Sequence, residues 1–178
     1  MKNITIRDKE FTPFISYDEI EIRIRELARR VNEDYAEREP LFLAILNGSF
    51  MFAADLFKYL DISCAISFIK LASYKGTTST GTVVSLIGLD ESLKNRDVIV
   101  LEDIVDTGKT LSNLLPSIEE HSPASLRVMT LLNKPDARTH QVQVDYVGFD
   151  IPDKFIVGFG LDYDGLARNL RDIYQLVE

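Results

Sequence analysis

The stretch from Val98 to Thr110 restricts the possible folds of this 178-residue chain more than any other part of it. Four apolar residues lead into the adjacent carboxylates Glu102 and Asp103, and a third carboxylate, Asp106, opens a Thr-Gly-Lys-Thr turn at 107–110. An apolar run that passes into a glycine-containing turn predicts a buried strand followed directly by a helix. The backbone N–H groups of that turn and the dipole of the helix attract an anion, so the stretch predicts a phosphate-binding turn.

Strand and helix patterns alternate along the rest of the chain. The predicted strands are residues 41–46, 65–71, 82–87, 97–101, 126–132, 146–149 and 155–159; the predicted helices are 17 to about 37, beginning with a capping box at Ser16, then 50–60 and about 110–120, with the last kinked or shortened by Pro116. Strands that alternate with helices predict an α/β fold with a mostly parallel sheet flanked by helices. Ligands of such sheets bind beyond the carboxyl ends of the strands, here after Leu46 and Leu101.

Composition and charge argue against several other classes of protein. The net charge of −8 and the pI near 4.8 do not suit a general nucleic-acid binder, which needs a basic face. No apolar run approaches the ~20 residues of a membrane-spanning helix, and the first ten residues lack the apolar core of a secretory signal. The lone Cys64 suits a reducing compartment. No repeat or linker divides the chain, so we expect a single cytoplasmic domain, residues 1–178, with neither nucleic acid nor membrane as a partner.

The three carboxylates around the predicted turn need a specific role. Beside a bound phosphate they would repel the ligand unless they contact its hydroxyl groups or a metal ion. Glu102 and Asp103 therefore suit ribose hydroxyls, and Asp106 suits proton transfer near a reacting base. The alternative is that all three are ordinary loop carboxylates. A nucleoside-triphosphate P-loop is excluded, because that motif needs a glycine where Asp103 stands.

Residues 98–110 resemble the phosphoribosyl pyrophosphate signature of the type I phosphoribosyltransferases, and from about Leu41 onward the chain is similar to the hypoxanthine-guanine branch of that family. The resemblance implies a core sheet with a small hood, mainly from about residue 147 to 178, and Mg²⁺ as cofactor. Phosphoribosyl pyrophosphate would be bound by Asn47, Gly48, Ser73, Tyr74, Glu102, Asp103, Asp106, Thr107, Gly108, Lys109, Thr110 and Arg168; the purine by Lys134, Phe155, Ile156 and Asp162; and Mg²⁺ by Glu102, Asp103 and Asp162.

The resemblance also implies individual roles within that set. Asp106 would act as the general base or acid, and Lys134 would donate to the six-position oxygen of the purine, which favours oxopurines over adenine. Phe155 would stack on the purine, although taken alone it suits the core of a strand, as Lys134 taken alone suits the surface. The polar loop at 73–81 reads as a hairpin loop by itself and matches the family's active-site lid. Many relatives carry a lysine at the position of Asn47, and the neutral amide of Asn47 departs from that pattern.

These features together predict a purine salvage enzyme that converts hypoxanthine or guanine and phosphoribosyl pyrophosphate to IMP or GMP and pyrophosphate. Two alternatives stay open: an enzyme that prefers xanthine, and a non-catalytic regulator that senses phosphoribosyl pyrophosphate. The predicted helix at Phe50–Leu60 is apolar nearly all round, so one of its faces is expected to meet a partner subunit in a homodimer or homotetramer.

Overall fold

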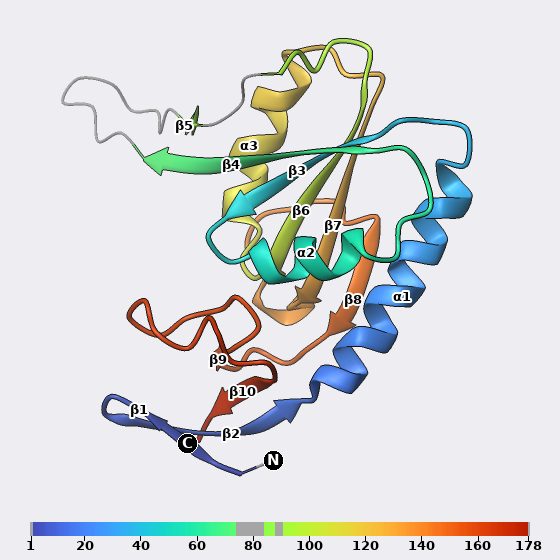
Figure 1. Ribbon diagram of the computed structural model, residues 1–178. Coiled ribbons are helices and arrows are strands. Elements are labelled where there is room, and N and C mark those ends of the chain that lie inside the picture. The colour runs from blue at the N-terminus through green and yellow to red at the C-terminus, as the bar shows by residue number, and fades with distance from the viewer. Residues whose placement is uncertain (1, 74–83, 88–90, 178) are drawn as a thin grey trace, which may run out of the picture.

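The computed structural model describes residues 2–73, 84–87 and 91–177, and its main sheet has the strand order β5-β4-β3-β6-β7-β8 (Figure 1). The bounds of these strands are Leu41–Leu46 (β3), Ala65–Ser73 (β4), Val84–Ile87 (β5), Asp97–Val105 (β6), Ser125–Asn133 (β7) and Tyr146–Asp150 (β8). Strand β5 runs antiparallel beside β4, and the other described pairs of this sheet are parallel. The predicted α/β fold with a mostly parallel sheet is confirmed.

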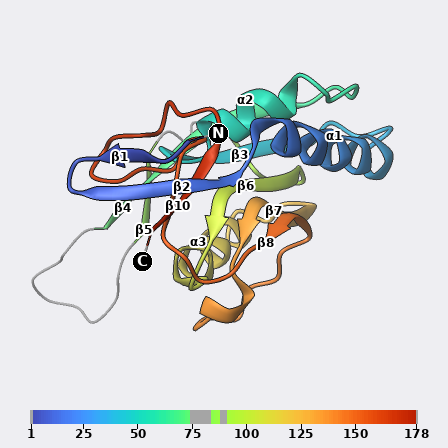
Figure 2. The same ribbon diagram turned by 90° about the horizontal axis from the view of Figure 1, so that it is seen from below.

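The helices cover the two faces of the main sheet. Helices α1 (Tyr17–Asp34) and α2 (Phe50–Phe57) lie on one face and α3 (Lys109–Glu119) lies on the other, as Figure 2 shows from below. The predicted capping box starts α1, with the Ser16 side chain accepting from the backbone of Glu19 and the Glu19 side chain accepting from the backbone of Ser16. Both α1 and α2 end three residues before their predicted ends, whereas α3 continues through Pro116 and ends one residue early.

Strands β6 and β9 differ most in length from their predictions: β6 is longer and β9 is shorter. Strand β6 continues four residues beyond Leu101 because it stays paired with β7 as far as Val105 and Asn133. Strand β9 (Ile156–Val157) is shorter than the predicted 155–159, because the backbone leaves the extended conformation at Gly158, where φ is 98°. The extension of β6 keeps Glu102 and Asp103 inside the sheet rather than in a loop.

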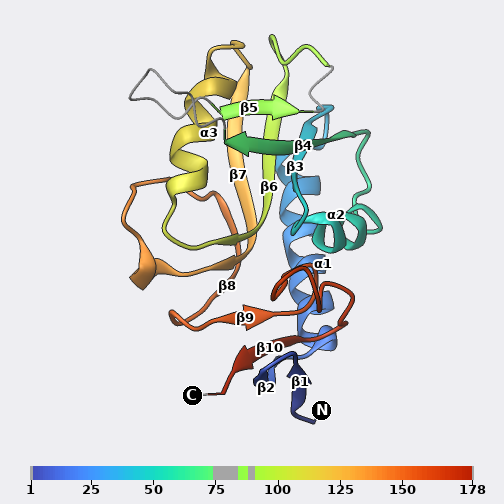
Figure 3. The same ribbon diagram turned by 90° about the vertical axis from the view of Figure 1, so that its left-hand side faces the viewer.

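A second, smaller sheet forms the hood, in the order β1-β2-β10-β9. Strands β1 (Ile4–Ile6) and β2 (Lys9–Ile15) come from the N-terminal part of the chain, and β10 (Ile173–Leu176) joins them to β9. The sequence patterns predicted neither this hairpin nor β10. The hood therefore draws half of its described strands from residues before α1, whereas the prediction placed it mainly at 147–178. Figure 3 shows it below the main sheet.

Buried side chains fill both spaces between the main sheet and its helices. Ile20, Ile24 and Leu27 of α1 pack with Phe42 of β3 on one face, and Leu111 and Leu114 of α3 pack on the other in a second cluster. Within the part of the chain that the structure describes, no helix is both long and apolar enough to cross a membrane. The two clusters hold the strands rigidly, which fixes the positions of the loops at their carboxyl ends.

Candidate active site

The chain order of the main sheet reverses between β3 and β6. From β3 the chain continues to β4 on one side, while β6 pairs with β3 on the other side, in parallel from Leu41 and Val98 onward. Such a reversal is where ligands of parallel α/β sheets bind. The loops at 47–49 and 106–108 leave the sheet at this edge, and the hood lies on the same side (Figure 1). The two loops expected to bind phosphoribosyl pyrophosphate are therefore neighbours.

Gly48 lies directly against the carboxylate of Asp103. A Cβ atom at Gly48 would lie only 1.6 Å from Asp103 Oδ2, so a side chain at this position would collide with the carboxylate. On its other side, Gly48 meets the hood: a Cβ at Gly160 would lie 2.1 Å from the Gly48 carbonyl oxygen. The peptide bond that precedes Asn47 is cis, and Asn47 itself is exposed. A side chain at Gly48 would therefore displace the Asp103 carboxylate, and a side chain at Gly160 would collide with the Gly48 backbone.

Glu102 and Asp103 point to opposite sides of β6, because successive side chains of a strand alternate. Burial, and secondarily the charge of Asp103, raises the pKa of Glu102 well above its ordinary value, and Glu102 Oε2 is buried with no hydrogen-bond partner. Burial likewise raises the pKa of Asp103 to about 6, although the backbone N–H of Ile104 donates to it at 2.8 Å. Two half-buried carboxylates, one of them with an oxygen that has no hydrogen-bond partner, fit a site for a metal ion or for sugar hydroxyls.

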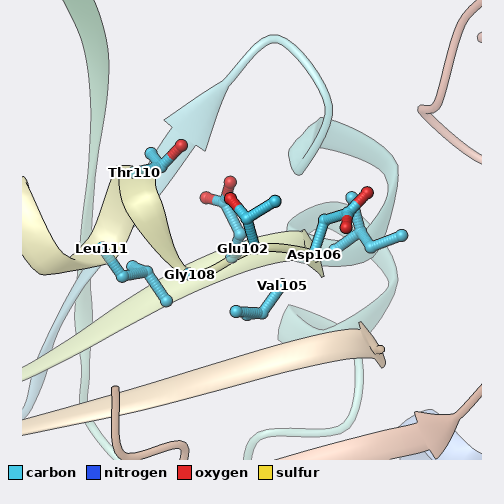
Figure 4. Close-up of a pocket in the computed structure, with 8 residues that line it drawn as sticks. Glu102, Val105, Asp106, Gly108, Thr110 and Leu111 are labelled. Atoms are coloured by element: carbon cyan, nitrogen blue, oxygen red, sulfur yellow. The ribbon is translucent and has the colours of Figure 1, made fainter. Parts of the chain in front are cut away.

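The turn that follows β6 surrounds a cavity of about 210 Å³. Figure 4 shows side chains of Glu102, Asp106 and Thr110 around this turn. The cavity is lined by Glu102, Ile104, Val105, Asp106, Thr107, Gly108, Thr110 and Leu111. Gly108 caps α3 in the left-handed conformation, with φ of 80°. The backbone N–H groups of Thr139 and His140 donate to the Thr107 carbonyl at 3.1 and 3.0 Å and so support the turn from outside. Lys109 is exposed. Of the predicted phosphate-binding residues 107–110, all except Lys109 therefore line one small cavity at a helix N-terminus, which suits an anion.

Lys134 is buried rather than at the surface, with only 5% of its area exposed. Its Nζ contacts Asp106 Oδ2 at 3.1 Å and Asp153 Oδ1 at 3.2 Å. The backbone N–H of Lys134 also donates to the carbonyl of Val105 at 2.9 Å, which ties the end of β7 to the end of β6. Two residues that the sequence assigned to proton transfer and to purine recognition are thus in direct contact.

The predicted purine-binding residues Phe155 and Ile156 differ in how far they are buried in the hood. Phe155 is 46% exposed, so the interpretation of this residue as part of a core is wrong. Its ring lies 6.2 Å from that of Phe11 and 5.9 Å from that of Tyr163, measured between centroids. Ile156 is buried in β9 and pairs with Gln175 of β10. A half-exposed ring beside two other aromatic rings offers surface for stacking.

Asp162 and Arg168 form an ion pair, with Asp162 Oδ1 and Arg168 Nη2 2.5 Å apart. Arg168 also donates to the Gly160 carbonyl at 2.6 Å, and the backbone N–H of Gly165 donates to Asp162 at 2.7 Å. Both charges act on the pKa of Asp103, which Arg168 lowers and Asp162 raises. Among the described residues, no three His, Cys, Asp or Glu side chains lie close enough to hold a metal ion by themselves. A Mg²⁺ ion would thus take several ligands from water and from substrate phosphates, as Mg²⁺ usually does.

Comparison with known proteins identifies the family. The family model described as "Phosphoribosyl transferase domain" matches residues 16–164. The chain belongs to the phosphoribosyltransferase family. Within that family it is 43% identical over 166 residues to the hypoxanthine phosphoribosyltransferase of Buchnera aphidicola subsp. Schizaphis graminum, which covers 92% of this chain and 94% of the relative. The hypoxanthine-guanine phosphoribosyltransferase of Streptococcus mutans is also 43% identical, over 164 residues, with 92% and 91% covered.

Solved phosphoribosyltransferase structures share the whole arrangement. A hypoxanthine-guanine phosphoribosyltransferase from Bacillus anthracis superposes with a TM-score of 0.85 at 39% identity, over 93% of this chain and 98% of the other. A substrate complex of the hypoxanthine phosphoribosyltransferase from Trypanosoma cruzi gives a TM-score of 0.86 at 36% identity, over 97% of both chains. The likeness to the hypoxanthine-guanine branch extends beyond the signature at 98–110 to nearly the full chain.

Some site residues lie outside the described part of the chain, and others had no sequence signal. Ser73 ends β4, whereas Tyr74 and the predicted lid at 74–81 lie outside the described residues. Asp153 was not singled out, because an acidic residue after a proline is ordinary for a turn. Arg138 was also missed: it donates to Asn133, and its Nη1 is buried without a partner beside Gly108. Only the fold brings these residues to the turn.

Proposed function

We propose that the protein transfers the phosphoribosyl group of phosphoribosyl pyrophosphate to hypoxanthine or guanine, which yields IMP or GMP and pyrophosphate. The observation that carries this proposal is the 3.1 Å contact between Lys134 and Asp106. It places a cation and a carboxylate side by side at the end of the phosphate-binding turn, where a sugar and a base would meet. The names of the relatives, hypoxanthine and hypoxanthine-guanine phosphoribosyltransferase, support purine salvage.

Asp106 and Lys134 have different roles toward the purine, proton transfer and recognition of the six-position oxygen. A purine ring nitrogen bonds to the anomeric carbon as the bond to pyrophosphate breaks, and Asp106 exchanges the proton of the purine imidazole ring, a role typically worth ~10²–10⁴-fold in rate. Two of the three N–H donors of Lys134 face Asp106 and Asp153; the third meets no acceptor among the described residues and would donate to the six-position oxygen. Adenine has an amino group at that position and would leave this donor unpaired, so oxopurines are favoured.

The other residues bind the sugar, its phosphates and the ring of the base. The 107–110 turn holds the 5′-phosphate, Glu102 and Asp103 accept from the ribose hydroxyls, and Arg168 approaches the pyrophosphate from the hood. The partnerless Glu102 Oε2 and the half-buried carboxylate of Asp103 would help to hold Mg²⁺, which would supply positive charge beside the leaving pyrophosphate. Phe155 offers its exposed ring for stacking, and Asp162 and Ile156 lie beside it in the hood. Carboxylates near the anomeric carbon stabilise the positive charge that develops there.

Two alternative functions are not favoured by the names of the relatives. An enzyme that prefers xanthine would use the same turn and the same Asp106, with different contacts around Ile156 and Asp162. A regulator that only senses phosphoribosyl pyrophosphate would bind it without turnover.

Steady-state kinetics test the proposal against both alternatives. Purified protein with Mg²⁺ and phosphoribosyl pyrophosphate is offered hypoxanthine, guanine, xanthine and adenine in separate assays. Turnover of the first two without adenine supports the proposed function, and a strong preference for xanthine corrects the substrate. Folded protein that binds phosphoribosyl pyrophosphate but turns over none of the four bases contradicts it.

We also propose that the protein works in the cytoplasm as a homodimer or homotetramer. Phe50 at the start of α2 and Phe68 in β4 are 41% and 42% exposed, and large exposed apolar side chains are typical of contact surfaces. Light scattering of the purified protein measures the mass of the particle, and the mass of a single chain contradicts this assembly.

A further inference from the structure

Tyr163 connects the purine side of the hood to the N-terminal hairpin. Its hydroxyl donates to Asp8 Oδ1 at 2.8 Å, across 155 positions of sequence. Asp8 stands in the two-residue tip between β1 and β2, where Ile6 pairs with Lys9. Tyr163 directly follows Asp162 in the loop that also carries Arg168. The hairpin thus touches the loop whose residues are assigned to substrate.

The rest of the hairpin tip contacts the same short segment. Arg7 Nε lies 3.5 Å from Asp164 Oδ2, and Arg7 Nη2 donates to the Asp164 carbonyl at 3.4 Å. Lys9 Nζ lies 5.7 Å from the centroid of the Tyr163 ring. Arg7 adopts a left-handed φ of 54°, a conformation that persists in a non-glycine residue when surrounding contacts hold it. Each exposed contact is weak, but together they converge on Tyr163 and Asp164. Figures 1 and 2 both draw the hairpin beside the C-terminal loop.

Tyr163 in turn contacts the ring of Phe155. The two rings meet edge to face, with centroids 5.9 Å apart and planes at 84°. Phe11 of β2 packs against both, at 6.1 Å from Tyr163 and 6.2 Å from Phe155. Because Phe155 is half exposed, its ring is oriented by such edge contacts rather than by a closed core.

We propose that Tyr163 and Asp8 are positioning residues for the purine: the hydrogen bond between them holds Tyr163 against Phe155 and thereby sets the affinity for the base. This inference rests on the proposed function, since it concerns the same site. Most residues assigned to phosphoribosyl pyrophosphate lie at the ends of the main-sheet strands, and Arg168 of the hood is held by Asp162 and by the Gly160 carbonyl rather than by Tyr163. The hydrogen bond therefore acts mainly on binding of the purine and changes binding of phosphoribosyl pyrophosphate much less.

Kinetics of three variants separate these effects. Tyr163→Phe removes the donor, Asp8→Ala removes the acceptor, and Asp8→Asn retains an acceptor oxygen without the charge. The first two should each raise the KM for hypoxanthine by roughly threefold to tenfold, the range for one partly exposed hydrogen bond to a charged group. The KM for phosphoribosyl pyrophosphate should change by less than about twofold. The kcat should be retained, because the variants weaken binding of the base equally in the ground state and in the transition state. The double variant Asp8→Ala with Tyr163→Phe should match the single variants, and Asp8→Asn should restore most of the affinity.

Glu10→Ala is the matched control, because it removes an exposed hydrogen bond of the same hairpin, from Asn3 at 2.9 Å, that does not reach Tyr163. It should leave both KM values unchanged. Unchanged KM for hypoxanthine in Tyr163→Phe, or equal changes in both KM values, overturns the inference. Failure of the wild-type protein to turn over hypoxanthine and guanine would instead overturn the proposed function, so the two failures are distinguishable.

Discussion

Replacement of Gly48 by alanine is expected to damage the active site by displacing one carboxylate. The three atoms nearest to the new Cβ all belong to Asp103, at 1.6, 2.4 and 3.0 Å. Asp103 Oδ2 must retreat by about 2 Å to reach an ordinary van der Waals distance. That movement disrupts the 2.8 Å hydrogen bond from the backbone N–H of Ile104 and turns the carboxylate away from the bound sugar.

The structure sets the size of both effects. Overpacking of this kind typically costs ~1–3 kcal/mol in the free energy of unfolding. Loss of one charged hydrogen bond to a ribose hydroxyl, worth ~1.5–3 kcal/mol, lowers kcat/KM for phosphoribosyl pyrophosphate by about 10-fold to 150-fold. The KM for hypoxanthine should change much less, because Lys134 and Phe155 are not displaced.

A double-mutant cycle isolates the collision. Urea unfolding gives the free energy of unfolding of Gly48→Ala in the wild-type background and in the Asp103→Ala background. Without the Asp103 carboxylate the methyl group has space, and Gly48 is not among the glycines with positive φ. Alanine should therefore be neutral there, or stabilising by ~0.4–1 kcal/mol through the unfolded chain. An equal loss of stability in both backgrounds would refute the explanation of this glycine.

Other predictions concern the proton, the base, the first helix and the thiol. Asp106→Asn keeps the size of the side chain, so kcat should fall by ~10²–10⁴-fold while binding of phosphoribosyl pyrophosphate, measured by calorimetry, changes little. Lys134→Met should lower kcat/KM for hypoxanthine by about 10-fold to 150-fold, with only a small loss of stability because Asp106 and Asp153 are 47% and 63% exposed; unchanged selectivity against adenine would remove Lys134 from base recognition. Ser16→Ala removes the cap of α1 and should lower Tm by roughly 2–4 °C without altering either KM. Burial raises the pKa of the Cys64 thiol, so at about pH 8 alkylation of Cys64 should be slower in folded than in urea-unfolded protein. The difference between the two alkylation rates should decrease as the pH rises, because the folded thiol then ionises as well. Equal alkylation rates at about pH 8 would contradict this prediction.

Local sequence patterns predicted the main sheet, but of the described hood strands they predicted only β9. Leu41–Leu46 is apolar throughout because β3 is covered on both faces, and such an apolar run predicts a buried strand from the sequence alone. Strand β2 mixes polar residues with Pro13 and gains its conformation from pairing with β10, which lies about 160 positions away and leaves no local pattern. Strand β10 likewise could not be predicted, because it too is held by pairing with strands far away in the sequence or outside any local pattern.

The candidate site divides in the same way. The carboxylates at 102, 103 and 106 could be predicted as site residues from the sequence, because three acidic residues precede a phosphate-binding turn. The burial of Lys134, and its contact with Asp153, depend on how the end of β7 meets the hood, which spacing along the chain does not encode. The contact of Asp8 with Tyr163 is equally invisible, since neither residue stands in a recognisable motif.

The pairing of β2 with β10 also orders events during synthesis of the chain. Residues 41–150 contain every described strand of the main sheet, so this sheet needs no strand made after Asp150. Strands β1 and β2 are made first, yet they have no neighbour in their sheet other than each other until Ile173–Leu176 emerges from the ribosome. Unlike the main sheet, the hood sheet therefore cannot be completed until β10 is available to join β2 to β9.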